Sequence, residues 1–214
     1  MISLHAAFGI AAVSLGMVLT PGPNMIYLVS RSITQGRRAG LISLTGVAVG
    51  FVVYMIAAAA GLAAVFALVP VVYTVLKIAG AGYLLWLAWS AVKPGGTSVF
   101  APKELPVDSP RKLFTMGLVT NLLNPKIAIL YVSLLPQFID PAGAPVALQS
   151  LELGLVQITI AITVNGLIAL GAGSIARFLS RRPSWLRVQR WVMGTVLAGL
   201  AIKLATDRSR AVAA

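Results

Sequence analysis

The chain has 214 residues, of which 58% are hydrophobic and only 10% are charged, and its mean hydropathy is +0.92. This composition excludes an ordinary soluble domain, in which about 25% of residues are charged. The net charge of +12 does not indicate nucleic-acid binding, because no soluble basic segment carries it. The absence of cysteine excludes disulfides and thiolate metal sites, and the single histidine, His5, gives metal binding little support.

The apolar residues form long blocks that are separated by short polar breaks. Blocks of about 20 residues match the length that a helix needs to cross roughly 30 Å of hydrocarbon, and open strands would leave backbone groups unsatisfied in lipid. The pattern therefore predicts an all-α integral membrane protein with six transmembrane helices. The predicted spans are residues 6–30, 40–68, 71–92, 113–137, 146–176 and 187–205.

A proline-rich, charged linker at residues 93–112 divides the chain, and it is too polar to span the membrane or to pack. It separates a first group of three spans, residues 1–92, from a second group, residues 113–205, and a tail follows at 206–214. Because three spans is an odd number, the second group enters the membrane from the opposite side. The chain is therefore predicted to contain two inverted three-helix repeats, which is a common architecture of secondary transporters.

Lysine and arginine are concentrated in the first, third and fifth loops, and the second and fourth loops carry none. Basic loops stay in the cytoplasm, so we expect these three loops inside and both termini outside. The N-terminus lacks a basic segment and a cleavage site, so we expect no removed signal peptide. The basic loop residues are Arg31, Arg37 and Arg38; Lys93, Lys103, Arg111 and Lys112; and Arg177, Arg181, Arg182, Arg187 and Arg190.

The first span contains the sequence Thr20-Pro21-Gly22-Pro23-Asn24. Two prolines remove two backbone donors and glycine adds conformational freedom, so we expect this helix to break here. Asn24 is predicted to cap the half-helix that restarts, with the positive end of its dipole facing a cavity. A simple proline kink is the alternative.

The fourth span is predicted to break at a second proline, where Asn121, Asn124, Pro125 and Lys126 precede the apolar run 127–135. An intramembrane charge costs several kcal/mol on insertion scales, so Lys126 should face a cavity or a partner. With the two asparagines nearby, the site is interpreted as a trap for a carboxylate. The alternatives are that Lys126 pairs structurally with a carbonyl or extends to the interface.

The fifth span contains three further polar residues. Glu152, near its outer end, is a candidate proton carrier or an interfacial carboxylate in contact with water. Gln157 and Asn165 lie deeper, where they would line a polar pathway or bond between helices.

Glycines predict two further features. Gly36 and Gly40 flank Arg38 in a turn before the second span, and Gly46 and Gly50, with Ala57 and Gly61 further along, should allow close helix packing.

These motifs resemble those of the lysine exporter and homoserine/threonine efflux family (LysE/RhtB), over essentially the full length. The matching residues are Pro21, Gly22 and Pro23; Gly36, Arg38 and Gly40; Asn124, Pro125 and Lys126; and Phe138. The resemblance implies export of amino acids or close metabolites across the bacterial cytoplasmic membrane, driven by proton exchange, with no cofactor. Neutral cargo such as homoserine or threonine is favoured, because a dibasic cargo would need a further buried carboxylate.

The expected partners are the amino acid and the lipid bilayer, and glycine-rich faces would allow a homodimer. A passive channel or a scaffolding subunit is the alternative function. A membrane enzyme is not expected, because the chain has no H-E-x-x-H, no G-x-S-x-G and no pair of intramembrane carboxylates.

Overall fold

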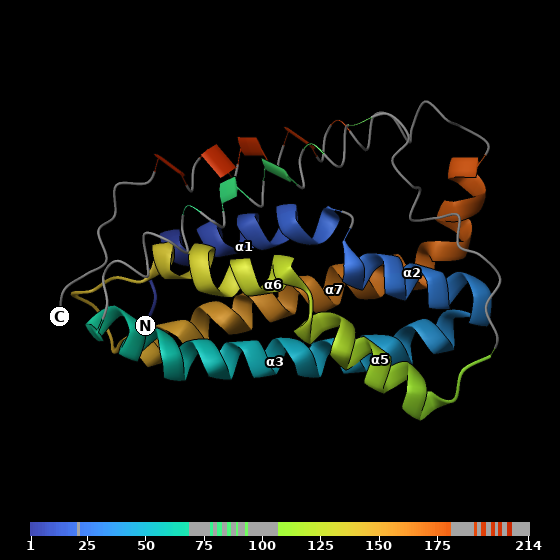
Figure 1. Ribbon diagram of the computed structural model, residues 1–214, viewed down its shortest axis with the longest axis horizontal. Coiled ribbons are helices and arrows are strands. Elements are labelled where there is room, and N and C mark those ends of the chain that lie inside the picture. Colours follow the sequence, from blue (N-terminus) through green and yellow to red (C-terminus); the bar gives the residue numbers. More distant parts are fainter. Residues whose placement is uncertain are drawn as a thin grey trace.

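The computed structural model describes residues 1–20, 22–68 and 107–180. It also describes residues 78, 81–82, 85–86, 89, 93, 191, 194–195, 198–199, 201–202 and 205–206, all helical except 93. Within these ranges the protein is built from helices and contains no strand, which confirms the all-α prediction (Figure 1). Most of the predicted third and sixth spans, and of the linker, lie outside the described residues.

The first half contains a broken helix followed by a long continuous one. Helices α1 (Leu4–Leu19) and α2 (Pro23–Gln35) are bent by 54° at the break, and α3 (Arg37–Leu68) follows. Gly36 joins α2 to α3 with a φ of +88°, a conformation that glycine adopts without a steric penalty. The predicted break and the predicted turn before the second span are therefore both present.

The second half repeats this order. Helix α5 (Pro110–Leu122) is bent by 48° against the segment Pro125–Phe138, which consists of α6 (Pro125–Ile129), a π-helical turn η1 (Leu130–Leu134) and a 3₁₀ turn η2 (Leu135–Phe138). Pro136 has no backbone N–H to continue an α-helix, which explains the change of helix type near it. Helix α7 (Val146–Ser180) follows.

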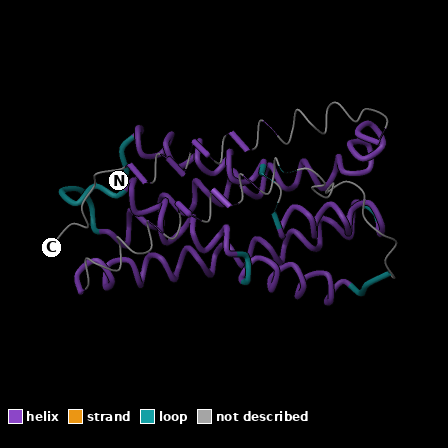
Figure 2. Tube along the Cα trace, turned by 45° about the horizontal axis from the view of Figure 1, so that its top comes forward, coloured by secondary structure: helices purple, strands orange, loops and turns teal. Residues whose placement is uncertain are grey.

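The two broken helices lie side by side and run in opposite directions, and their breaks face each other near the middle of the molecule (Figure 1). Helix α3 packs against α5 and α7, and α1 and α2 also pack on α7. The helices run alongside one another along the length of the molecule (Figure 2). In the described part, Arg37–Gly61 and Val146–Ser174 are long and apolar enough to cross a membrane, and each bent pair also qualifies as one span.

Glycines allow α3 and α5 to touch at their backbones. A side chain on Gly46 would collide with the carbonyl oxygen of Phe114, and one on Gly117 would collide with that of Ser43. A Cβ atom on Gly50 would lie 2.7 Å from the side chain of Asn121, whereas Gly61 has no described neighbour within 4 Å. The predicted close packing is therefore present at Gly46 and Gly50 and not at Gly61 among the described residues.

The end of the linker differs from the prediction that it is too polar to pack. Helix α5 begins at Pro110, capped by Ser109, so the helix starts inside the predicted linker. Asp108 is buried, forms ion pairs with Arg31 and Lys112, and exchanges two hydrogen bonds with Gln35, at 2.8 and 2.9 Å. The prediction was wrong here because an opposite charge from α2 compensates the burial of the carboxylate.

Candidate functional site

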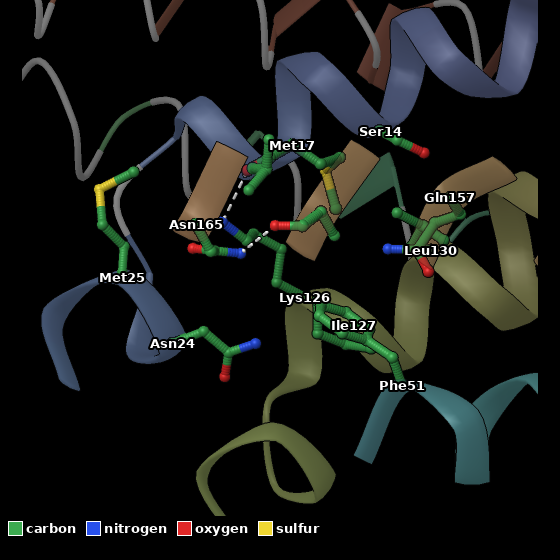
Figure 3. Close-up of a pocket in the computed structure, with 12 residues that line it drawn as sticks. Ser14, Met17, Asn24, Met25, Phe51, Lys126, Ile127, Leu130, Gln157 and Asn165 are labelled. Carbon is green, nitrogen blue, oxygen red and sulfur yellow. Dashed lines mark hydrogen bonds between the residues drawn. The ribbon is translucent and has the colours of Figure 1, made fainter. Parts of the chain in front are cut away.

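Lys126 lies at the meeting point of the two breaks and is only 5% exposed. It is the second residue of α6, where Asn124 is the N-cap and accepts a hydrogen bond from the Lys126 amide at 3.1 Å. The Lys126 ammonium crosses to the other half of the chain and donates to the carbonyl oxygens of Met17, at 2.8 Å, and Thr20, at 2.7 Å. Figure 3 shows the first of these bonds.

These carbonyls are available because α1 ends at Leu19. The last carbonyls of a helix have no partner within the helix, and they form the negative end of its dipole. Two of these last carbonyls accept hydrogen bonds from Thr20. The Thr20 hydroxyl donates to the Gly16 carbonyl at 2.8 Å, and the Thr20 amide donates to the Met17 carbonyl at 3.2 Å. Lys126 thus makes the carbonyl contact named above as the structural alternative, and this contact accounts for two of its three N–H donors.

Gly22 leaves the space that the ammonium fills. A Cβ atom at this position would lie 2.9 Å from Nζ and 3.2 Å from Cε of Lys126, so a side chain would displace the lysine. Gly22 is also the N-cap of α2, and Pro23 takes the first helical position. Pro21 is outside the described residues.

A small cavity of about 20 Å³ adjoins Lys126, which is room for about one water molecule. Its lining combines apolar side chains with a few polar groups from both halves of the chain (Figure 3). The apolar lining residues are Met17, Val18, Met25, Phe51, Ile127, Leu130 and Ala161. The polar ones are Ser14, Asn24, Lys126, Gln157 and Asn165.

Three buried oxygen atoms of this lining have no hydrogen-bond partner among the described residues: Ser14 Oγ, Asn24 Oδ1 and Asn165 Oδ1. The amide of Asn165 donates to the Ala161 carbonyl at 2.9 Å, which fixes the orientation of its side chain. A buried unsatisfied acceptor costs about 1–3 kcal/mol. Three of them around one cavity are suited to bind a ligand that carries hydrogen-bond donors.

The predicted site residues divide into those that line the cavity and those that support it. Asn24, Lys126, Gln157 and Asn165 line it. Gln157 also accepts a hydrogen bond from the Tyr131 hydroxyl at 2.6 Å, so it both lines the cavity and bonds between elements.

Three other predicted residues lie elsewhere. Asn121 packs against Gly50 of α3, and Asn124 caps α6. Glu152 is half-buried and accepts a hydrogen bond from the Ile2 amide at 2.6 Å, and it is not part of the cavity lining. The prediction that Asn24 caps α2 was wrong, because Gly22 is the N-cap and Asn24 is the second residue of the helix.

Sequence reasoning missed the other eight lining residues, which are Ser14, Met17, Val18, Met25, Phe51, Ile127, Leu130 and Ala161. Ser14 alone carried a signal in the sequence, as a polar residue three positions before Met17 in an apolar helix. The seven apolar residues look like ordinary core residues in the sequence.

Two broken, apolar helices that meet at a buried lysine define a membrane translocator, since interrupted spans build the binding sites of such proteins. A family model described as "LysE type translocator" matches residues 15–208, and the chain belongs to this family. It is therefore a transporter and not an enzyme.

Three curated relatives are 26–28% identical to the chain over about nine tenths of its length. It is 28% identical to the leucine efflux protein of Klebsiella pneumoniae subsp. pneumoniae over 193 residues, which are 90% of this chain and 91% of that protein. It is also 28% identical to the leucine efflux protein of Enterobacter sp., covering 89% and 90% of the two chains. The leucine efflux protein of Salmonella typhi is 26% identical, covering 90% and 91%. No solved structure matches the chain.

Proposed function

We propose that this chain is a secondary transporter that exports neutral aliphatic amino acids from the cytoplasm in exchange for protons. The observation that carries the proposal is the cavity beside Lys126, which combines one cationic donor, unpartnered acceptor oxygens and an apolar wall. These are the three kinds of group that an α-amino acid with an aliphatic side chain requires.

The two charged ends of the substrate would find opposite partners. Lys126 has one N–H beyond the two that bind carbonyls, and this donor would take the carboxylate. Free amides in the first turn of α2, beginning near Gly22, would support the same charge through the positive end of the helix dipole. The acceptor oxygens of Asn24 and Asn165 would take the ammonium group.

The apolar lining favours leucine-like cargo over the homoserine or threonine that the sequence analysis preferred. Met25, Phe51 and Leu130 would cover an aliphatic side chain, and Ser14 Oγ is the unpartnered lining oxygen that remains for a hydroxyl group once Asn24 and Asn165 bind the ammonium. The relatives named leucine efflux proteins point to the same cargo.

Transport would require the two halves, residues 1–92 and 113–205, to move relative to each other. A cavity of about 20 Å³ is too small for an amino acid, so the site would have to widen before it admits its substrate. We propose six spans in two inverted repeats in the cytoplasmic membrane of a bacterium, with both termini outside. The described basic residues Arg31, Arg37, Arg38, Arg111 and Lys112 near the 35–37 turn and the start of α5 support this orientation.

Glu152 remains the candidate proton carrier, and Gln157 and Asn165 the candidate pathway residues. Glu152 joins the N-terminal segment to the first turns of α7 through its bond to Ile2. The N-terminus lies at the end of the molecule away from α2 (Figure 1). Protonation of Glu152 would remove the negative charge from this contact and weaken it, which is a means of coupling a proton to opening at that end.

The test is efflux of labelled leucine, with labelled threonine and homoserine in parallel, from cells with and without the protein. Lys126→Met should abolish leucine efflux while the protein still inserts, and the exposed Lys112→Met serves as the matched control. Full efflux by Lys126→Met would sink the proposed site. Accumulation of leucine against its gradient in vesicles with an imposed pH gradient distinguishes an exchanger from a passive channel.

A further inference from the structure

The backbone carbonyls of Met17 and Thr20, at the end of α1, form a cation site that a side chain of the protein itself fills. Oxygens of Met17 and Thr20 converge on one nitrogen, at 2.8 and 2.7 Å, at the negative end of a 16-residue helix. In transporters with broken helices, carbonyls freed at such helix ends coordinate the coupling cation, commonly Na⁺. Here the cation is covalently attached to the opposite half of the protein.

The corresponding break in the second half shows that a charge is not needed to satisfy freed carbonyls. The carbonyl of Leu122, at the end of α5, accepts a hydrogen bond at 2.8 Å from the neutral hydroxyl of Tyr54. A hydroxyl would have served equally well at α1 and would not have required burial of an ammonium group. The need to satisfy these two carbonyls therefore does not by itself explain why a charged residue stands at Lys126.

Three features hold the ammonium in this place. Asn124 caps α6 and fixes the backbone from which the side chain starts, and Gly22 leaves room for Nζ. Among the described residues no carboxylate forms an ion pair with Lys126, so carbonyl dipoles and the α1 helix dipole are the groups that stabilise its charge.

We infer that Lys126 is a built-in cation, which occupies the coordination place of a diffusible monovalent cation and frees the transporter from any requirement for Na⁺. It also denies these two carbonyls to the ammonium group of the substrate, which is left with Asn24 and Asn165 on the other side of the cavity. The consequence for transport rests on the proposed function, whereas the occupation of the carbonyl site does not.

The test uses the purified full-length chain in detergent and needs no amino acid. Lys126→Ala vacates the carbonyl site, so ethylammonium, at about five times its dissociation constant, should raise the melting temperature of this variant by about 2–4 °C. Tetramethylammonium has no N–H to donate and should not raise it. Lys126→Met keeps the site filled by an apolar side chain of similar length and should respond to neither cation. Lys112→Ala, at an exposed position, should likewise show no shift of its own melting temperature with either cation, as in the wild type.

Three results would overturn the inference: no response of Lys126→Ala to ethylammonium, an equal response to tetramethylammonium, or an equal response of Lys126→Met. If Lys126→Ala does not fold, the wild-type protein decides. Replacing Na⁺ by K⁺ or choline should change neither its melting temperature nor its transport rate, and stabilisation by Na⁺ would refute a filled site. Failure of leucine transport alone would contradict the proposed function and leave the melting result standing.

Discussion

Removing the negative charge of Asp108 should weaken the contact between α2 and α5. The side chain of Asp108 is 3% exposed and that of its partner Arg31 is 10% exposed, whereas that of Lys112 is 58% exposed. Taking one partner from a buried pair leaves the other charge uncompensated, at about 3–5 kcal/mol. Because this pair lies at the end of the helices, we take the lower figure, about 3 kcal/mol, for Asp108→Asn.

Lys112→Ala removes the other ion pair of the same carboxylate and is the matched control. Water screens this exposed pair, so its loss should cost less than about 1 kcal/mol. For a chain of this length, about 1 kcal/mol shifts the melting temperature by about 2–4 °C, which gives about 6–12 °C for Asp108→Asn and at most about 4 °C for Lys112→Ala. Thermal unfolding in detergent measures both, and equal shifts would refute the argument from burial.

The same carboxylate predicts a dependence on pH. Hydrogen bonds from Lys112, and then from Gln35, hold the pKa of Asp108 below its ordinary value of 3.8. A lowered pKa in the folded state gives stability that is complete above the unfolded value and is lost as the pH falls through the folded value. As the pH falls below 3.8, the wild-type protein should therefore begin to lose its advantage in stability over Asp108→Asn, and a difference between the two that stays constant with pH would contradict this account.

Gly117→Val should destabilise the protein by about 1–3 kcal/mol, measured by thermal unfolding, because the valine side chain would meet the backbone of α3. Gly173→Ala is the control and should be near neutral, because no described neighbour lies within 4 Å of the added Cβ atom. Tyr131→Phe leaves the buried Gln157 oxygen without its donor and should cost about 1–3 kcal/mol by the same measurement. Asn165→Ala should raise the KM for leucine efflux about tenfold, which corresponds to about 1.4 kcal/mol, with little change in the maximal rate; an unchanged KM would exclude its oxygen from ammonium binding.

The positions of the breaks could be predicted from the sequence because they depend on local chemistry. Proline removes a backbone donor wherever it stands, so Pro23 and Pro125 interrupt helices regardless of what surrounds them. The identity of a cap depends on one further local choice, namely which residue takes the first helical position. Proline took that position in both breaks, which made Asn124 a cap and excluded Asn24.

The burial of Asp108 could not be read from a linker rich in charge and proline. Its environment is provided by Arg31 and Gln35, more than 70 positions earlier in the chain. The sequence around Asp108 indicates only that a carboxylate prefers water. The side chains that make its burial possible belong to α2, and the local sequence does not reveal them.

The sequence by itself determined an apolar helical protein with two interrupted spans and a lysine within one of them, because length, hydropathy and proline act locally. Only the tertiary structure decided that Lys126 reaches the carbonyls of α1, and that Ser14, Phe51 and Asn165 face the same cavity. Apolar helices in lipid can pack on several faces with similar burial, so the polar contacts and the glycine positions select the arrangement. Those contacts join residues more than 100 positions apart, and no local pattern encodes them.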